Sequence, residues 1–448
     1  MRNRGRLVLI FITSVLVIFW VTYIQPSLKV ATGYAAKYMC SYTFLSNVSE
    51  KNIDNALQFF PMAYVDFDID KENKTVKTSI FGIASQQANY YENGYNCGCV
   101  LGELDVEDIT TDKQDLASKL KAQDTLAWPQ GNLVNISDSS LFDHEKLSTD
   151  LDKIMKDNPN TLAIVVAHKE ELIAEKYQKG VKADSRLLGW SMTKTVGSAL
   201  YGTMNAQGVL NADDPSEIKE WENDERINIS MGNLLQMSSG LDWLEDYDQL
   251  SSVTRMLYLE EDMPAYAVKS KATAKPNEKW YYSSGTSNIL AKIMREKLPN
   301  YSSYANYPYE KLFHEIGMYS ATIETDNKGN HVLSSYGWAT ARDWTRFGLL
   351  YLYEGNWFGK QVFTSDWVKY STTDVEDSKG TYGAQIWLNK KGDAIKNVPT
   401  DAFYEDGFGG QRILIIPSKE MVITVMSGNQ KGFDFEGLYE KIFAAYKG

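Results

Sequence analysis

The stretch 189-GWSMTKTVGSALYGTMNAQG-208 decides how the rest of the chain is interpreted. Val196, Leu200 and Met204 recur at helical spacing, and the glycine at the end is suited to closing a helix. The segment is therefore predicted to be a helix that begins close to Ser191. Residues three apart lie on one face of a helix, so Ser191 and Lys194 would present their hydroxyl and amine side by side.

A serine hydroxyl is a weak nucleophile at neutral pH and needs a base beside it. The chain has four histidines, at His144, His168, His314 and His331. They show no metal-binding spacing, and the stretch GWSMT has Thr193 where a G-x-S-x-G nucleophile elbow needs glycine. A Ser-His-Asp hydrolase is therefore disfavoured. Lys194 is the candidate base, because burial one turn into a helix would lower its pKa.

An isolated S-x-x-K arises by chance in many chains, so the pair needs supporting motifs. The segment 280-WYYSSGTSNIL-290 contains Y-x-S in two registers, beginning at Tyr281 and at Tyr282. A phenol beside a lysine can carry a proton between nucleophile and leaving group. Farther along, 407-GFGGQRILIIP-417 is a glycine-rich entry into a predicted edge strand, whose N–H could face an oxyanion.

Apolar strand patterns lie on both sides of a helical middle in the second part of the chain. Strands are predicted at 161–168, 171–178 and 381–389, and a hairpin at 412–427 that turns at Pro417–Glu420. Helical runs fill the middle, about 209–333, and the amphipathic run 435–448 is predicted to pack as a helix on the sheet. The pattern predicts an α+β fold with an antiparallel sheet flanked by helices and an inserted helical domain.

Three further motifs accompany those quoted above: 210-LNADDP-215, 234-LLQMSSGLDW-243 and 341-ARDWTRFGLLYL-352. The whole set resembles the serine β-lactamase and penicillin-binding superfamily. It is most similar to the class C-related branch of esterases, peptidases and 6-aminohexanoate-oligomer hydrolases. The resemblance covers roughly 144–448, in the family's order, and implies a β-lactamase/transpeptidase-like domain over 141–448. It also implies hydrolysis of an amide or ester through an acyl-enzyme, with no cofactor and no metal.

The resemblance assigns roles to four residues near the predicted helix and the Y-x-S motif. Ser191 would be the acylated nucleophile, Lys194 the amine that activates it, Tyr282 the general base and acid, and Ser284 a support of the proton network. Tyr282 is preferred over its neighbour because it lies six residues after Pro276, as in the family pattern P-G-x-x-x-x-Y-S.

The glycine-rich motif would complete the site. The backbone N–H groups of Ser191 and Gln411 would form the oxyanion hole, with Gly409 and Gly410 leading into the strand. The family usually has Lys or His where Phe408 stands, a side chain that helps to hold a β-lactam carboxylate. Weak β-lactamase activity is therefore expected.

Other residues have a less defined expected role. Asn277 replaces a common glycine, and asparagine tolerates positive φ. Trp243, Tyr247, Tyr382 and Trp387 would line an aromatic substrate pocket or belong to the core. The expected substrate is a small molecule or a short peptide or amide. The alternative function is a penicillin-binding-type sensor or peptidoglycan-binding protein that is acylated but turns over slowly.

Residues 1–30 are predicted to be a cytoplasmic tip and a membrane anchor. Arg2, Arg4 and Arg6 precede an uncharged run from Leu7 to Ile24, which is long enough to cross a bilayer as a helix. Arginines favour the cytoplasmic side, so the pattern predicts a single span in the inner membrane with the catalytic domain outside the cytoplasm.

The alternative for this segment is a cleaved signal peptide, which would make the protein secreted. Small residues at Gly33, Ala35 and Ala36 would then serve a peptidase. The formal net charge of -12 argues against a nucleic-acid partner, because binding phosphates needs an excess of Lys and Arg. The oligomeric state is not predicted.

Residues 31–140 are predicted to be a small accessory segment lying against the main domain. Within it, 63–82 alternates apolar and polar residues around a KENK turn, which predicts a β-hairpin. The chain's three cysteines also lie here. Cys40 would pair with Cys97 or Cys99 outside the cytoplasm, or all three would be small buried residues. Cys-Gly-Cys is too short for a zinc site.

Overall fold

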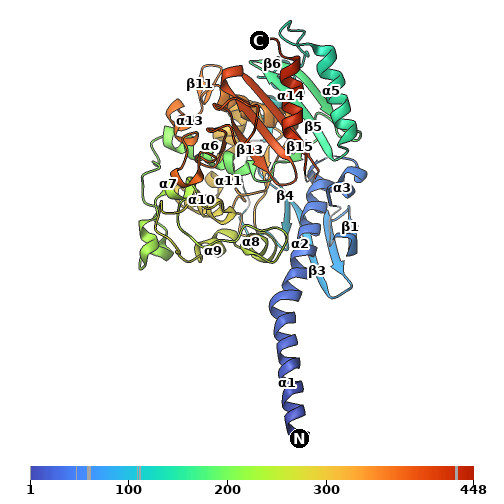
Figure 1. Cartoon of the computed structure of the whole chain (residues 1–448), viewed down its shortest axis with the longest axis vertical. Helices are drawn as coiled ribbons and strands as arrows, with labels where there is room; N and C mark the ends of the chain where they lie inside the picture. Colours follow the sequence, from blue (N-terminus) through green and yellow to red (C-terminus); the bar gives the residue numbers. More distant parts are fainter. Residues whose placement is uncertain (1, 47, 58–61, 108, 110–112, 429–431) are drawn as a thin grey trace.

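The computed structural model consists of a long N-terminal helix, a small sheet beside it and a larger α+β body (Figure 1). It describes residues 2–46, 48–57, 62–107, 109, 113–428 and 432–448. The body contains the predicted antiparallel sheet flanked by helices, so the expected fold class is confirmed.

The N-terminal helix is continuous from the apolar run into the folded body. It comprises α1 Arg2–Phe19, the π-helical turn η1 Trp20–Ile24, α2 Gln25–Ser41 and the π-helical turn η2 Tyr42–Ser46. Its side chains are exposed from Arg6 to Tyr23 and buried from Ala31 to Tyr42. Within the described part of the chain this is the one helix long and apolar enough to cross a membrane. The side chains of Arg2 and Arg4 lie outside the described residues.

The small sheet has four antiparallel strands in the order β1-β2-β3-β4. They are β1 Val65–Asp70, β2 Thr75–Ile80, β3 Ala84–Asn93 and β4 Asn96–Leu101. β1 and β2 form the predicted hairpin, with Asp70 opposite Thr75 at the KENK turn. Two helices flank this segment in the sequence, α3 Glu50–Leu57 and α4 Lys113–Gln123.

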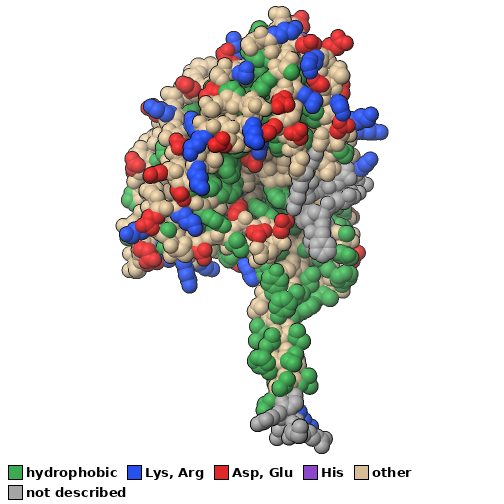
Figure 2. All heavy atoms as spheres, viewed as in Figure 1, with side chains coloured by type: hydrophobic (Ala, Val, Ile, Leu, Met, Phe, Trp, Pro, Cys, Tyr) green, Lys and Arg blue, Asp and Glu red, His purple; other side chains and the backbone are tan. Residues whose placement is uncertain are grey.

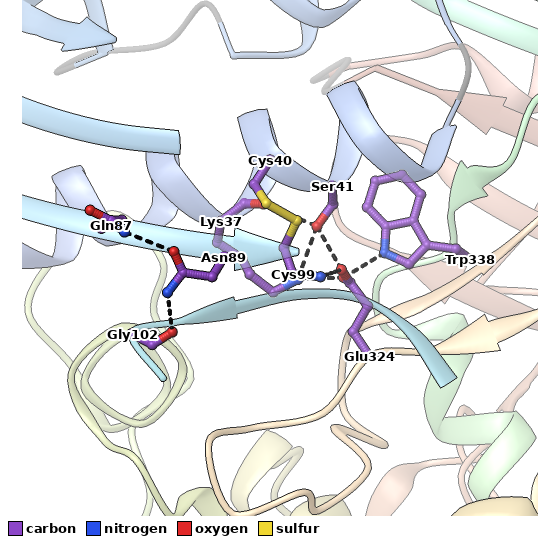
Figure 3. The surroundings of a disulfide bond; sticks show 9 residues. All are labelled: Lys37, Cys40, Ser41, Gln87, Asn89, Cys99, Gly102, Glu324 and Trp338. Carbon is purple, nitrogen blue, oxygen red and sulfur yellow. Dashed lines mark hydrogen bonds and ion pairs between the residues drawn. A yellow bond between two sulfur atoms is a disulfide. The ribbon is translucent and has the colours of Figure 1, made fainter. Parts of the chain in front are cut away.

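A disulfide between Cys40 and Cys99 joins α2 to β4 (Figure 3). The side chain of Cys97, the other candidate partner, lies outside the described residues. Beside the bond, the buried Lys37 ammonium forms an ion pair with Glu324. Glu324 also accepts hydrogen bonds from Ser41 Oγ, the Cys99 backbone N–H and Trp338 Nε1, each at 2.7 Å. This buried carboxylate therefore has an ion-pair partner and three hydrogen-bond donors, which offset the cost of burying its charge.

The main sheet has six strands in the order β12-β13-β14-β15-β5-β6, and every neighbouring pair is antiparallel. The strands are β5 Thr161–His168, β6 Glu171–Tyr177, β12 Trp387–Leu388, β13 Phe403–Gly407, β14 Gln411–Ile416 and β15 Met421–Ser427. One expectation is wrong: the strand predicted over 381–389 is reduced to β12. The backbone leaves the extended conformation at Gln385, where φ is 62°, and this side chain donates to the carbonyls of Leu234 and Leu235.

Helices cover both faces of the main sheet (Figure 1). α5 His144–Asp157 and the predicted C-terminal helix, α14 Phe435–Ala445, pack on the face that carries Leu414. α12 Ala341–Leu352 packs on the other face, where Gly348 approaches Ile413. Because successive strand residues face opposite sides, two buried faces require an unbroken apolar run such as 162–167 in β5, all of whose residues are buried.

The helical part lies beside this sheet and beside a small sheet of order β7-β9-β8. Its helices are α6 Met192–Ala206, α7 Met231–Leu235, α8 Ser252–Leu259, α9 Met263–Val268, α10 Ser284–Lys297, α11 Tyr301–Pro308 and α13 Ser365–Ser371. The short strands are β7 Leu187–Leu188, β8 Thr322–Ile323, β9 Gly337–Ala339, β10 Asn356–Trp357 and β11 Lys360–Gln361.

Candidate active site

A tight turn between β7 and α6 presents Ser191. Trp190, just before it, lies in the left-handed region with φ 49°, a conformation that costs a non-glycine residue about 1–3 kcal/mol. The turn is held by Thr193 Oγ1, which donates to the Trp190 carbonyl at 2.7 Å and accepts from the Gly337 N–H at 2.9 Å. Gly189 has no room for a Cβ, which would lie 2.5 Å from the Trp344 ring.

The ring of Trp190 packs between the N-terminal helix and the cleft. Tyr38 of α2 lies 4.7 Å from it, centroid to centroid, and Phe408 lies 5.1 Å away on another side. Tyr247 completes the group at 6.2 Å. Aromatic packing of this kind offsets the cost of the strained backbone. The helix α2 therefore supports the turn that carries Ser191.

Lys194 lies one helical turn beyond Ser191 and is buried. Its Nζ is 3.0 Å from Ser191 Oγ, 3.0 Å from Ser284 Oγ and 2.9 Å from the Ser334 carbonyl oxygen. Burial lowers the pKa of Lys194 to about 8, while the charge of Glu245 opposes that change. Roughly a tenth of the amine is therefore neutral at pH 7, and this form can accept a proton.

Tyr282 and Ser284 bring the second motif to the same point. The Lys194 ammonium lies 4.8 Å from the centroid of the Tyr282 ring. Burial raises the pKa of Tyr282 well above its ordinary value, and a hydrogen bond with Ser191 opposes that rise. Tyr281, the alternative register, is 39% exposed and its backbone N–H donates to Met237. The structure therefore brings Tyr282, and not Tyr281, to the serine and lysine.

Glu245 is a site residue that the sequence analysis missed. Its carboxylate accepts hydrogen bonds from the Ser284 backbone N–H at 2.8 Å, from the Ser284 hydroxyl at 2.5 Å and from Trp243 Nε1 at 2.6 Å. Glu245 lies two residues after Trp243, the last residue of a motif. An acidic residue at that place was the available signal for a site residue. Trp243 itself is buried and orients this carboxylate.

The glycine-rich hairpin between β13 and β14 forms the opposite wall. Gly409 and Gly410 have φ values of 80° and 93°, which suit a reversal that L side chains rarely adopt. Gly407 packs against the Gly189 carbonyl, where a Cβ would lie 2.3 Å from the oxygen. The side chain of Gln411 pairs twice with the Ser427 backbone, at 2.7 Å each, and fixes the start of β14.

A cleft of about 360 Å³ opens between these elements. Its lining residues are Ser191, Glu245, Tyr247, Tyr282, Trp387, Asp406, Gly407, Phe408, Gly409, Gly410, Arg412, Gly432, Phe433 and Phe435. Of the four expected aromatic residues, Tyr247 and Trp387 line it, whereas Tyr382 is buried 5.8 Å behind the ring of Tyr282.

Two carboxylates, those of Glu245 and Asp406, line the cleft. Arg412 is the one cation among its described lining residues, and its Nε binds Asp406 Oδ1 at 2.7 Å. Over the described residues, no group of three or more His, Cys, Asp or Glu side chains could hold a metal ion. The wall at Phe408 is apolar, and its ring packs against that of Tyr247 with centroids 5.1 Å apart.

Comparisons with known proteins agree with this architecture. Residues 151–447 match the family model "Beta-lactamase". The "Putative 6-aminohexanoate-dimer hydrolase from Bacillus anthracis" has 21% identity and a TM-score of 0.56, over 80% of this chain and 89% of that one. A family VIII carboxylesterase has 13% identity and a TM-score of 0.54, over 68% and 98% of the two chains.

A third structure is the octameric penicillin-binding protein homologue from Pyrococcus abyssi. It has 17% identity and a TM-score of 0.54, over 67% of this chain and 77% of that one. At such identities, these solved structures show a shared fold. The family model, in contrast, matches more than half of the sequence. The chain belongs to the beta-lactamase family, within the serine β-lactamase and penicillin-binding protein superfamily.

Proposed function

We propose that this protein is a membrane-tethered serine hydrolase that cleaves an amide or ester through an acyl-enzyme on Ser191. The observation that carries the proposal is the buried Lys194 amine, 3.0 Å from Ser191 Oγ and with a pKa lowered to about 8. A base of this pKa, poised beside a hydroxyl, suits the activation of a serine near neutral pH.

The hydrogen bonds around Lys194 support its role as the base. The Ser284 hydroxyl donates to Glu245, so toward Lys194 it can only accept. The Ser334 carbonyl is also an acceptor. These two acceptors take the two N–H bonds of the neutral amine, and its lone pair is left for the proton of Ser191.

In this mechanism Ser191 Oγ attacks the substrate carbonyl as its proton passes to Lys194. The developing oxyanion would bind the backbone N–H groups of Ser191 and Gln411. Burial keeps the Tyr282 phenol protonated, so it would donate its proton to the leaving group and recover one from Lys194. Water then attacks the acyl-enzyme, with the same groups acting in reverse.

We further propose that the apolar helix anchors the protein in the inner membrane with its N-terminus in the cytoplasm. Arg2, Arg4 and Arg6 precede the run Leu7–Ile24. Basic residues next to a membrane span favour the cytoplasmic side. Cleavage near Ala36 would cut α2 where its side chains are buried, which favours a retained anchor.

Labelling with a fluorophosphonate probe tests the proposed chemistry. We expect the native protein to be labelled, and Ser191→Ala to lose the label. Lys194→Ala should lower turnover of a short acyl ester by several orders of magnitude, because a catalytic unit fails when one member is lost. Labelling of Ser191→Ala would refute the assignment. The sensor alternative would be favoured if penicillin left an acyl group that persists on the protein and if esters were turned over only slowly.

A further inference from the structure

Three large apolar side chains project from one end of the small sheet. Phe81 and Ile83, in the turn between β2 and β3, are 70% and 54% exposed, and Tyr64 just before β1 is 52% exposed. The rings of Tyr64 and Phe81 lie 5.9 Å apart. We call these three residues the sheet tip. Large apolar side chains gathered at an exposed turn indicate a contact surface.

The strand register shows which way the sheet tip points. Cys99 of β4 is bonded to Cys40, near the C-terminal end of α2. Thr78 Oγ1 of β2 donates to the Thr32 carbonyl at 2.8 Å, about two turns nearer the N-terminus of that helix. In the cross-strand register Thr78 lies beyond the level of Cys99 in the direction of Ile80. The turn after Ile80 therefore points toward the apolar run.

The height of the sheet tip follows from the rise of the two elements. A strand rises about 3.3 Å per residue, so Phe81 lies roughly 10 Å beyond Thr78. At about 1.5 Å per helical residue, that distance reaches the level of roughly residue 26 of the helix. The apolar run ends at Ile24, and the headgroup layer beyond the hydrocarbon core is roughly 5–7 Å thick. The sheet tip thus lies at the level of that layer.

Contacts on another side of the helix give the same level for the base of the folded body. Arg255 of α8 donates from Nη2 to the carbonyl of Thr22 at 3.5 Å. Helix side chains are exposed from Arg6 to Tyr23 and half-buried from Ile24 to Leu28. Figure 2 shows apolar side chains at the base of the body, continuous with the apolar surface of the helix. The body therefore begins where the apolar run ends.

We propose that the sheet tip is a second membrane contact: Tyr64, Phe81 and Ile83 enter the interfacial layer of the bilayer that the N-terminal helix spans. The inference rests on the proposed membrane anchor. Aromatic side chains favour this layer, and Arg255 at the same height would meet lipid phosphates. The body is then seated on lipid at two points, which fixes its tilt about the helix.

Contact of the sheet tip with lipid would also fix the distance between the catalytic cleft and the membrane. Tyr38, which packs on the residue before Ser191, is fourteen residues beyond Ile24. That separation corresponds to roughly 21 Å of helix. The cleft would therefore act on acyl groups presented within about that distance of the membrane surface, such as those on membrane-attached molecules or on polymers close to the bilayer.

Photocrosslinking to lipid tests the proposal in the full-length protein. The protein is reconstituted in vesicles of equal parts phosphatidylcholine and phosphatidylglycerol. Benzoylphenylalanine replaces Phe81 in the sheet tip, Phe11 in the apolar run, or Asn73 in the β1–β2 turn at the opposite end of the sheet. All three positions are exposed, so none of the replacements disturbs the core. We expect the yield of lipid crosslinks at position 81 to approach that at position 11. No lipid crosslinks are expected at position 73.

The three positions separate the two proposals. Labelling at position 11 without labelling at position 81 would overturn the second contact and leave the anchor intact. Equal labelling at positions 73 and 81 would overturn the proposed orientation of the sheet. Absence of labelling at position 11 would overturn the membrane anchor itself, and the sheet tip proposal with it.

Discussion

At the scale of single residues, the two Y-x-S registers differ by one position and predict different catalytic tyrosines. Tyr282→Phe removes only a hydroxyl from a half-buried ring, so the fold should persist. Turnover of a short acyl ester should fall at least ~100-fold, the usual contribution of a positioned acid–base group. Tyr281→Phe is the matched control and should change little, because that side chain is 39% exposed. A larger loss for Tyr281→Phe would mean that the register is wrong by one residue.

Glu245→Gln should change the pH dependence of the reaction. Lys194 must be neutral to accept the serine proton, so activity should rise with pH through its pKa of about 8. The Glu245 charge raises that pKa. Its removal should therefore move the acidic limb of kcat/KM to lower pH. The maximal rate should also fall, because an amide cannot accept every hydrogen bond that Glu245 now accepts.

The matched control for this change is Asp242→Asn, an exposed acidic residue on the same loop. It should leave the acidic limb in place. A limb that stays fixed in Glu245→Gln, while the rate falls, would mean that Glu245 only supports the structure. The measurement is kcat/KM for a neutral ester across the pH range in which the fold is stable.

Phe408 should set the preference between β-lactams and simple esters. It offers an apolar ring where a cation would hold the β-lactam carboxylate, and a hydrogen bond to a charged group contributes about 1.5–3 kcal/mol. We expect nitrocefin to be a much poorer substrate than p-nitrophenyl acetate. Phe408→His should raise the ratio of the two kcat/KM values by roughly one to two orders of magnitude. An unchanged ratio would contradict this role.

At the scale of elements, the disulfide should stabilise the packing of α2 on the small sheet. It joins residues 59 apart, and closing a loop of that length stabilises a fold by about 4 kcal/mol in the chain-entropy model. Reductant should therefore lower the midpoint of thermal unfolding of the native protein. The double variant Cys40→Ser, Cys99→Ser should unfold at the lower midpoint with or without reductant. A native protein whose bond is reduced without any shift would contradict the expectation.

Elements whose pattern is local could be predicted from the sequence. The runs that became β5, β6, β14 and β15 each contain a short apolar stretch, and α6 and α14 follow helical periodicity, so each was recognisable alone. The strand expected over 381–389 failed because distant carbonyls hold Gln385 out of the extended conformation. Glu245 was missed for a similar reason, since its role depends on Ser284, thirty-nine residues away. The acidic residue after the motif is visible in the sequence, but its contact with Ser284 is not.

At the scale of the whole molecule, one helix connects the proposed membrane anchor to the catalytic turn. Tyr34 and Tyr38 of α2 pack on Trp190, beside Ser191. Lys37 of the same helix forms a buried ion pair with Glu324 of the main body. Removal of one partner of a buried ion pair typically costs ~3–5 kcal/mol, because the other charge is left without compensation. We therefore expect α2 and the turn that carries Ser191 to unfold together.

This packing predicts that the N-terminal segment is retained in the mature protein. The small residues that resemble a peptidase site are inside the fold: Ala35 and Ala36 are fully buried, and a Cβ on Gly33 would lie 3.1 Å from the Tyr258 side chain. Intact mass measurement of protein purified from membranes should give a chain that still contains Leu7–Ile24, and alkaline carbonate should not extract it. A soluble form that begins near Lys37 would contradict the prediction. It would also lack Tyr34, so that the packing on Trp190 and the activity of that form should both be impaired.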